Sequence, residues 1–283
     1  MLYKKLKLCY TANMEKSLSF MEYKDEDFYF MFSESKTQKG ETNYITHSHP
    51  RYEMMFIDEG CVEYLVENRR HELKKGDVLL VKSGILHFAR TIVTSPSKRY
   101  CIGFFPESIP HGNLAKEIFD KGEHFVLGEN SLFSKLTNAL CHKLENSNTN
   151  AKVFTKNLMD SLILALSEET LGAEEEPKSS DSSLKRIIDY INANLTAIKT
   201  MDDIADALFF SKSYLGHLFK KETNMGIMEY VRNKKVVRAH TLILNGEKPT
   251  EIYLECGFSN YPSFFRAYRA FFGFSPKMKK GEN

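Results

Sequence analysis

Three side chains that commonly bind metal ions lie close together near residue 50. His47, His49 and Glu53 are separated by even numbers of residues, so on one continuous strand all three would point to the same face. Imidazole and carboxylate groups are ligands for divalent first-row metals such as Zn, Fe, Mn or Ni. The spacing therefore makes this segment a candidate metal site, provided that a strand carries it.

The surrounding sequence has the pattern of an all-β region. Short apolar runs recur at short intervals, and turn-prone residues such as Gly60 and Gly76 separate several of them. Many short strands at such spacing predict a barrel or a sandwich. The runs are Phe28–Phe32, Tyr52–Ile57, Val62–Val66, Val78–Val81 and Tyr100–Phe105.

The order of residues in this region resembles the two-part cupin motif, over about residues 28 to 105. The matching positions are His47, His49, Glu53, Gly60, Gly76, Lys82 (where proline is usual), Gly84 and His87. The resemblance implies a double-stranded β-helix in which the three histidines and Glu53 converge. Two interpretations stay open: the four side chains bind a divalent metal, or they line and stiffen an effector pocket without one.

The other candidates for chemistry are isolated in the sequence. His111, His124 and His142 lack any such spacing and are expected at the surface. The five cysteines lie far apart with no CxxC spacing, which argues against a disulfide framework and a thiolate zinc site. A reducing cytoplasm is the expected location.

Two apolar stripes follow the β region and predict a pair of helices. Leucine recurs every four residues from Leu132 to Leu144, and a second series runs from Phe154 to Leu166. These stripes either pack on the barrel or on each other, or they form a dimer interface, and the sequence does not choose between these interpretations.

A composition change then marks a domain boundary. Ala173–Ser183 reads AEEEPKSSDSS, which is acidic and serine-rich. From Leu184 onward there are 16 Lys and Arg against 10 Asp and Glu, whereas the preceding residues hold 23 against 27. A basic C-terminal third indicates a polyanion partner. No apolar run is long enough to span a membrane. We expect a barrel over 1–128, a helical pair over 129–172, a linker over 173–183 and a separate basic domain over 184–283.

The C-terminal third contains one internal layout twice. Met201–Leu208 predicts a short helix, Phe209-Phe210 a turn, and Ser211 the cap of a helix over Lys212–Thr223. Thr250–Cys256 predicts a second short helix, followed by a turn at Gly257 and a cap at Ser259 or Asn260. The helix after it is expected to bury Phe264, Tyr268 and Phe272.

Two helix-turn-helix units of this kind suit one DNA duplex. The segment between them, from Gly226 to Asn245, predicts a helix about 30 Å long. One turn of B-form DNA is about 34 Å. The two recognition helices are therefore expected in successive major grooves.

The same third resembles AraC/XylS-type transcription regulators, from about Leu184 to Pro276. The resemblance rests on SYLGHLFKKET (Ser213–Thr223), ECGFSN (Glu255–Asn260) and FFGFSP (Phe271–Pro276). It implies a bacterial, sequence-specific regulator, usually an activator, that contacts RNA polymerase. It also implies a sensor barrel for a small effector, such as a sugar or another polar metabolite, and we expect a homodimer.

The resemblance also implies residue roles. Base reading falls to Ser213, Gly216, His217, Tyr261, Pro262, Phe265 and Arg266; phosphate contacts fall to Lys212, Lys220 and the caps Ser211 and Asn260; Arg269 is exposed on the same helix.

Two of these positions depart from the family pattern. Arginine is common where His217 stands, and Gly216 offers no side chain to a base, so the first helix reads its site weakly or DNA shape contributes more. Arg266 is the best candidate for guanine recognition.

The sequence thus predicts an α+β regulator with a barrel, a helical pair and an all-α double helix-turn-helix domain. We expect no enzymatic activity. The alternatives are a metal-dependent cupin enzyme fused to a DNA-binding module, and a ligand-independent DNA-binding protein with a purely structural barrel.

Overall fold

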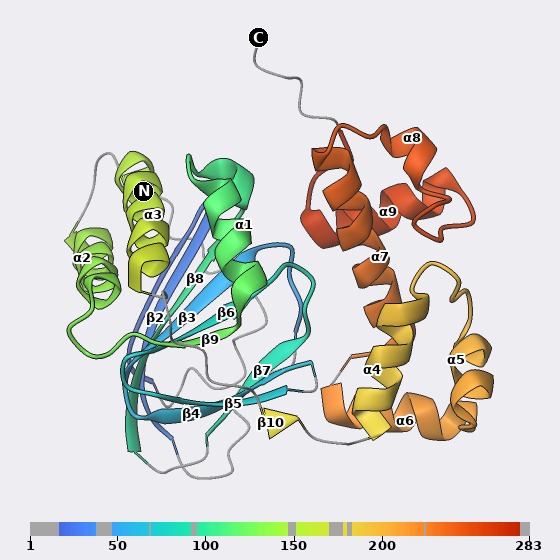
Figure 1. The fold of residues 1–283 in the computed structure, drawn as a ribbon, viewed down its shortest axis with the longest axis horizontal. Coiled ribbons are helices and arrows are strands. Elements are labelled where there is room, and N and C mark those ends of the chain that lie inside the picture. The colour runs from blue at the N-terminus through green and yellow to red at the C-terminus, as the bar shows by residue number, and fades with distance from the viewer. Residues whose placement is uncertain are drawn as a thin grey trace. The chain divides into compact units, whose positions relative to one another are not determined.

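The structure is a computed structural model that describes residues 17–37, 47–67, 69–91, 95–146, 151–169, 178–179, 183–223 and 225–277. These residues form two compact units. The first holds strands β1–β9 with helices α1–α3, and the second holds helices α4–α9 (Figure 1). Within the described ranges, no helix has the length and apolar character needed to cross a membrane.

The first unit is built on antiparallel sheets. Its strands are β1 (Ser17–Lys24), β2 (Phe28–Thr37), β3 (Tyr52–Glu59), β4 (Cys61–Val66), β5 (Arg69–Lys74), β6 (Asp77–Val81), β7 (His87–Thr91), β8 (Ser95–Phe104) and β9 (His124–Val126). A six-stranded sheet has the order β1-β2-β8-β3-β6-β9. A four-stranded sheet has the order β10-β5-β4-β7, in which β10 is Lys178–Ser179. The α+β class and the strand-rich N-terminal domain are confirmed.

Strand alternation gives the larger sheet two different faces. Met54 and Phe56 of β3 join an apolar cluster with the helices, whereas Glu53 and Met55 point to the opposite side because successive side chains alternate. On that side the two sheets meet: His87 of β7 lies 3.3 Å from the Glu53 carboxylate. The sheet thus separates an apolar layer from an interior that also holds buried polar side chains.

Three helices supply the apolar layer. They are α1 (Gly112–Lys121), α2 (Leu132–Asn146) and α3 (Ala151–Glu169), preceded by the short 3-10 helix η2 (Pro106–Ser108). Leu140, Leu144, Leu162 and Leu166 are buried in one cluster with the sheet residues. The predicted stripes therefore pack within the chain, which is the first of the two open interpretations.

Some elements of this unit carry no apolar run and are missed by the sequence pattern. β5 reads RRHELK, in which only His71 and Leu73 point inward and are buried. Helix α1 lies inside the predicted barrel segment. Of the predicted linker, residues 173–177 and 180–182 lie outside the described residues, Lys178–Ser179 form β10, and Ser183 begins α4.

The second unit is all-helical. Its elements are α4 (Ser183–Asn194), α5 (Met201–Leu208), α6 (Lys212–Thr223), α7 (Ile227–Leu244), α8 (Pro249–Ile252) and α9 (Tyr261–Phe272). The predicted bounds of α5 and α6 are confirmed. The predicted helix over Thr250–Cys256 is wrong in its second half: regular helix ends at Ile252 and turns continue to Gly257. Both Ile252 and Cys256 are buried, so their four-residue spacing imitates a longer helix.

Side chains fix where these helices begin. Asp203 accepts hydrogen bonds from the backbone N–H groups of Lys199 and Thr200, at 2.7 and 2.8 Å, before α5. Ser211 Oγ accepts from Tyr214 N at 3.2 Å, and Asn260 Oδ1 accepts from Ser263 N at 2.9 Å. Each oxygen satisfies an N–H group that has no partner inside its helix. Of the two predicted caps for the last helix, Asn260 is the one used.

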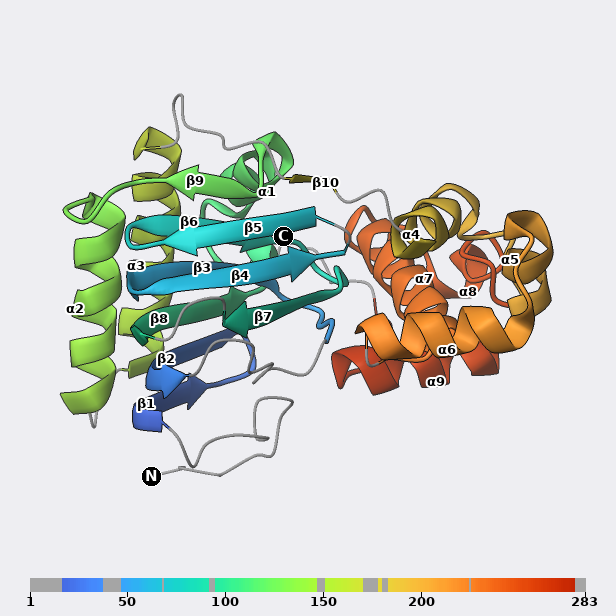
Figure 2. The ribbon, with the colours of Figure 1, turned by 90° about the horizontal axis from the view of Figure 1, so that it is seen from below.

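The two recognition helices lie at different ends of α7 but on one side. In Figure 1, α7 runs between α6 and α9, and in Figure 2 both α6 and α9 lie along the lower edge of the helical unit. The remaining helices, α4, α5 and α8, lie above that edge in Figure 2.

Candidate DNA-binding surface and sensor site

Helix α6 presents a polar face to solvent. Leu215 and Phe219 are buried in the core, and the ring of Phe219 lies 5.5 Å from that of Tyr230 in α7. The exposed face carries Ser211, Lys212, Ser213, His217 and Lys220, with Gly216 half-buried among them. All six residues that the sequence assigns to DNA contact in this motif therefore lie on one accessible surface.

Lys212 has an intramolecular partner on that surface. Its Nζ lies 2.6 Å from an Asp202 carboxylate oxygen in the first turn of α5. The hydrogen bond to Asp202 is the main reason that the pKa of Lys212 is raised. A DNA phosphate approaching Lys212 would compete with this carboxylate.

Helix α9 follows the same plan with larger side chains. Phe264, Tyr268 and Phe272 are buried as predicted. Asn260, Pro262, Arg266 and Arg269 are exposed, and Tyr261 and Phe265 are half-buried. Tyr261 packs edge-on against Tyr253, with ring centroids 5.8 Å apart. The Arg266 guanidinium has one long contact, 3.4 Å to Ser263 Oγ, and extends from the exposed face of the helix.

The four residues of the cupin-like pattern come together. One ligand atom from each of His47, His49, Glu53 and His87 lies within 4.8 Å of the others. Glu53 and His87 are almost completely buried, and the rings of His47 and His49 lie 5.5 Å apart. Three imidazoles and one carboxylate are a donor set that fits a divalent first-row metal.

A cysteine that the sequence pattern did not single out adjoins this set. Cys101 of β8 is buried and hydrogen-bonds through Sγ to Glu53 Oε1. Met55 stands opposite Cys101 in the β3–β8 register, and Glu53 stands opposite Gly103. Only the strand pairing brings Cys101 to Glu53, because 48 residues separate them along the chain.

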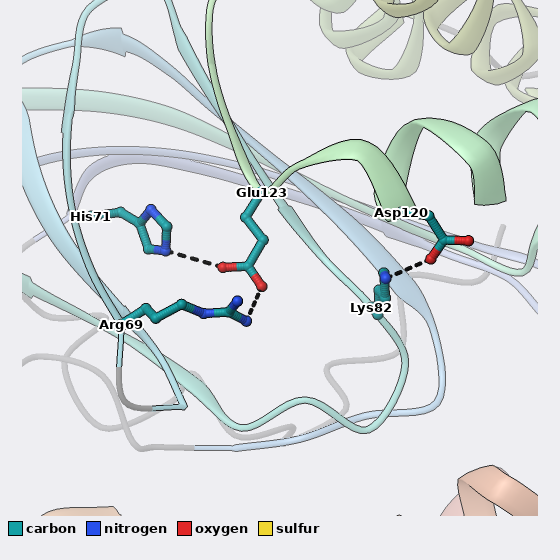
Figure 3. A network of polar contacts seen from close by, with 5 residues as sticks. All are labelled: Arg69, His71, Lys82, Asp120 and Glu123. Atoms are coloured by element: carbon teal, nitrogen blue, oxygen red, sulfur yellow. Dashed lines mark hydrogen bonds and ion pairs between the residues drawn. The ribbon is translucent and has the colours of Figure 1, made fainter. Parts of the chain in front are cut away.

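A second polar network occupies another part of the same unit (Figure 3). Glu123 accepts from Arg69 and lies 3.2 Å from His71 Nε2, so it links β5 to the segment before β9. In the same figure Lys82 forms a 2.6 Å ion pair with Asp120 of α1. Lys82 stands where proline is usual in the cupin motif, and here its side chain tethers a helix.

The surface position expected for His124 is wrong. His124 is buried and its Nε2 lies 3.1 Å from Asp77 Oδ2, while its ring lies edge-on to that of His71 at 5.9 Å. The pairing of β6 with β9 places it inside. His111 and His142 are exposed as expected.

Comparison with known proteins decides what these two units are. Residues 204–279 match the helix-turn-helix domain family, and residues 38–163 match the AraC-like ligand binding domain family. The chain belongs to the AraC family of transcription regulators. It is a DNA-binding transcription regulator with a ligand-binding domain.

Relatives of this AraC-family regulator match along most of its length. It is 27% identical over 249 residues to the Msm operon regulatory protein of Streptococcus mutans serotype c, covering 85% of this chain and 84% of that protein. It is 25% identical over 242 residues to the transcriptional activator RhaR of Mannheimia succiniciproducens, with coverage of 81% and 84%. The solved structure of ToxT from Vibrio cholerae O395 covers 89% of this chain and 96% of that chain, with a TM-score of 0.38 and 13% identity.

Proposed function

We propose that this AraC-family regulator places α6 and α9 in successive major grooves of one DNA duplex. The observation that carries the proposal is the arrangement of two exposed helix faces along one edge of the helical unit (Figure 2). Helix α7 between them has 18 residues and is about 27 Å long. That length is of the same order as the ~34 Å turn of B-form DNA.

The exposed side chains of α6 and α9 differ, and they favour different DNA contacts for the two helices. Arg266 is exposed and has the geometry to donate two hydrogen bonds to guanine O6 and N7. Helix α6 offers Ser213, Gly216 and His217; glycine has no side-chain group, and a hydroxyl or an imidazole cannot make the two parallel donations of a guanidinium. We therefore assign most direct base reading to α9 and a larger share of backbone contact, through Lys212 and Lys220, to α6.

The test is selection of bound DNA from random sequence, followed by measurements on Arg266→Ala and Arg266→Lys. We expect Arg266→Ala to weaken binding by about 1–3 kcal/mol and to relax the preference at about one base pair. Arg266→Lys keeps the charge but not the two-pronged geometry, so it should keep the salt dependence and lose the preference. A uniform loss across all sequences would make Arg266 a phosphate contact and contradict the assignment.

We also propose that the barrel binds a small polar effector that changes DNA binding. The support is the set of buried polar side chains between the two sheets, which includes Glu53, His71, His87 and Arg99. Operator binding should change with at least one member of a panel of sugars and polar metabolites. Identical binding with every member would favour the ligand-independent alternative.

We further propose that the regulator acts in the cytoplasm, as a homodimer that contacts RNA polymerase.

A divalent metal ion is the second proposal for the barrel. His47, His49, Glu53 and His87 would hold it, and a bound Zn, Fe, Mn or Ni ion would supply Lewis-acid coordination to an effector oxygen. The Glu53 carboxylate also contacts both His87 and Cys101. Two neighbours from different strands thus hold Glu53 in place at the site.

Metal analysis of protein purified without chelator tests this proposal. We expect about one ion per chain, lost in Glu53→Gln, with His142→Gln as an exposed control that retains it. A metal-free wild-type chain would leave the histidines as pocket residues.

Since the relatives are transcription regulators, we infer that the chain is not an enzyme. Turnover of a substrate by the metal-loaded chain would contradict that inference.

A further inference from the structure

Helix α7 carries a charged side chain in an unusual place. Lys235 lies in the middle of the helix and is only 5% exposed. Among the described residues of α4–α9, it is the one buried charged side chain. Lysine is rarely buried unless its ammonium group has partners, so the partners indicate what the residue does.

The partners of Lys235 come from both halves of the DNA-binding unit. Its Nζ donates to the carbonyl oxygen of Ile198, in the segment between α4 and α5, and to that of Gly257 at 2.9 Å, in the turn before α9. The first carbonyl belongs to the helix-turn-helix unit that ends in α6, and the second belongs to the unit that ends in α9. One ammonium group therefore joins the two helix-turn-helix units, which are the two halves of the DNA-binding unit.

The two halves also touch directly at Gly257. A Cβ atom at this position would lie 2.4 Å from Thr196 O and 2.9 Å from Lys235 Nζ, and φ of Gly257 is +81°. Gly273 has nearly the same φ, +82°, but a Cβ atom there would meet no atom within 4 Å. The close approach is thus a property of this junction and not of left-handed glycine in general.

An apolar side chain would not replace Lys235. The ammonium group donates in two directions, and without it the carbonyls of Ile198 and Gly257 would lose a buried donor. Burial lowers the pKa of Lys235, and the charge of Asp203 partly offsets that effect. Burying the Lys235 ammonium group costs desolvation free energy, and its two hydrogen bonds offset that cost. These hydrogen bonds also fix the position at which the two halves meet.

We propose that Lys235 is a positioning residue for DNA recognition: together with Gly257 it fixes the placement of α6 relative to α9 and so selects the separation between the two half-sites. The inference rests on the proposed insertion of both helices into one duplex. One added base pair moves the second half-site by about 3.4 Å and turns it by about 35° around the DNA axis. A fixed pair of helices matches one separation, whereas a pair joined only through a loosened α7 accepts several.

The test uses DNA selected with the wild-type chain, in which the separation between the two half-sites is then changed by one or two base pairs. Binding is followed by fluorescence anisotropy. For the wild type we expect a loss of about tenfold or more for one base pair in either direction. For Lys235→Met we expect that penalty to fall below about threefold, with affinity for an isolated half-site within about twofold of wild type. Lys235→Arg, which can donate to both carbonyls, should restore the penalty.

A glycine pair provides the matched control. Gly257→Ala and Gly273→Ala introduce the same backbone strain, but only the first forces the two halves apart. Gly257→Ala should flatten the dependence on separation and Gly273→Ala should leave it unchanged, with folding checked by circular dichroism. If Lys235→Met does not fold, this pair and Lys235→Arg still decide the matter.

Two results would overturn different parts of the proposal. Folded Lys235→Met or Gly257→Ala that keeps the wild-type dependence on separation would remove the positioning role. A wild-type chain that gains no affinity from the second half-site at any separation would instead refute the proposal that both helices read one duplex.

Discussion

The two units of the regulator place their charged groups in opposite ways. The barrel buries several ionisable side chains and pairs them with one another, as in His87 with Glu53 and His124 with Asp77. Helices α4–α9 bury an apolar core with Lys235 as the one charged member among the described residues, and keep their other charges at the surface. In a buried pair each group replaces water as the partner of the other, whereas an exposed cation stays accessible to a polyanion outside the protein.

This contrast predicts that barrel pairs determine stability and helical-unit pairs determine binding. The largest effect is expected for Asp77→Ala. Asp77 Oδ2 accepts from Lys74 N at 2.8 Å and contacts His124 Nε2 at 3.1 Å. Removing the carboxylate leaves two buried or half-buried groups without that acceptor, so the free energy of unfolding should fall by about 2–5 kcal/mol. Urea unfolding followed by circular dichroism measures it.

The adjoining strand β5 supplies the control for Asp77→Ala. Glu72 lies 3.7 Å from Lys74 Nζ and both side chains are well exposed. Because exposed ion pairs contribute little, Glu72→Ala should change the free energy of unfolding by less than about 0.5 kcal/mol. Equal effects of the two substitutions would remove the distinction between buried and exposed pairs in the barrel.

A smaller effect, of opposite sign, is expected at Gly216 in α6. An added Cβ atom would meet only the Met201 side chain, at 3.7 Å or more, which is ordinary contact. Alanine is favoured over glycine inside a helix, so Gly216→Ala should raise the free energy of unfolding by about 0.5–1 kcal/mol. Thermal unfolding provides the measurement. Destabilisation would mean that α6 packs more tightly against α5 than the structure shows.

The smallest change in stability is expected for Asp202→Asn. Asp202 and Lys212 are both largely exposed, so their 2.6 Å ion pair should contribute nothing measurable to folding. In DNA binding the same substitution removes a competitor for Lys212, and affinity should rise about two- to threefold at low salt. Anisotropy titrations at two salt concentrations test this, and unchanged affinity would exclude Lys212 from the phosphate contacts.

The sequence predicted the helical unit more accurately than the barrel, and the reason is the range of the signals. Helix α6 begins and ends where its local pattern indicates, because the Ser211 cap directly precedes the helix and the Leu215–Phe219 spacing lies within it. His124 was misplaced because its partner, Asp77, is 47 residues away and is brought close by strand pairing. Cys101 was overlooked for the same reason.

The two candidate sites, the histidine–glutamate set and the Lys235 junction, also differ in how far the sequence predicts them. The cupin-like pattern predicted that His47, His49, Glu53 and His87 come together. One continuous strand does not do this, because β3 begins at Tyr52 and the two histidines precede it. The junction at Lys235 had no signal in the sequence, since a lysine within a basic helix is normally a solvated residue. Only the carbonyl groups of Ile198 and Gly257 distinguish it, and backbone groups carry no sequence signature.

Consecutive residues of strand β3 face the two different layers of the barrel unit. Glu53 and Met54 are consecutive, yet one contacts His87 and the other packs with the phenylalanines beneath α1–α3. Inserting a single residue in β3 ahead of Glu53 would exchange the two faces of the strand. The Glu53 carboxylate would then point into the apolar layer, and the Met54 thioether would point toward the histidines. The register of β3 against β8 therefore determines which face of the strand carries the carboxylate.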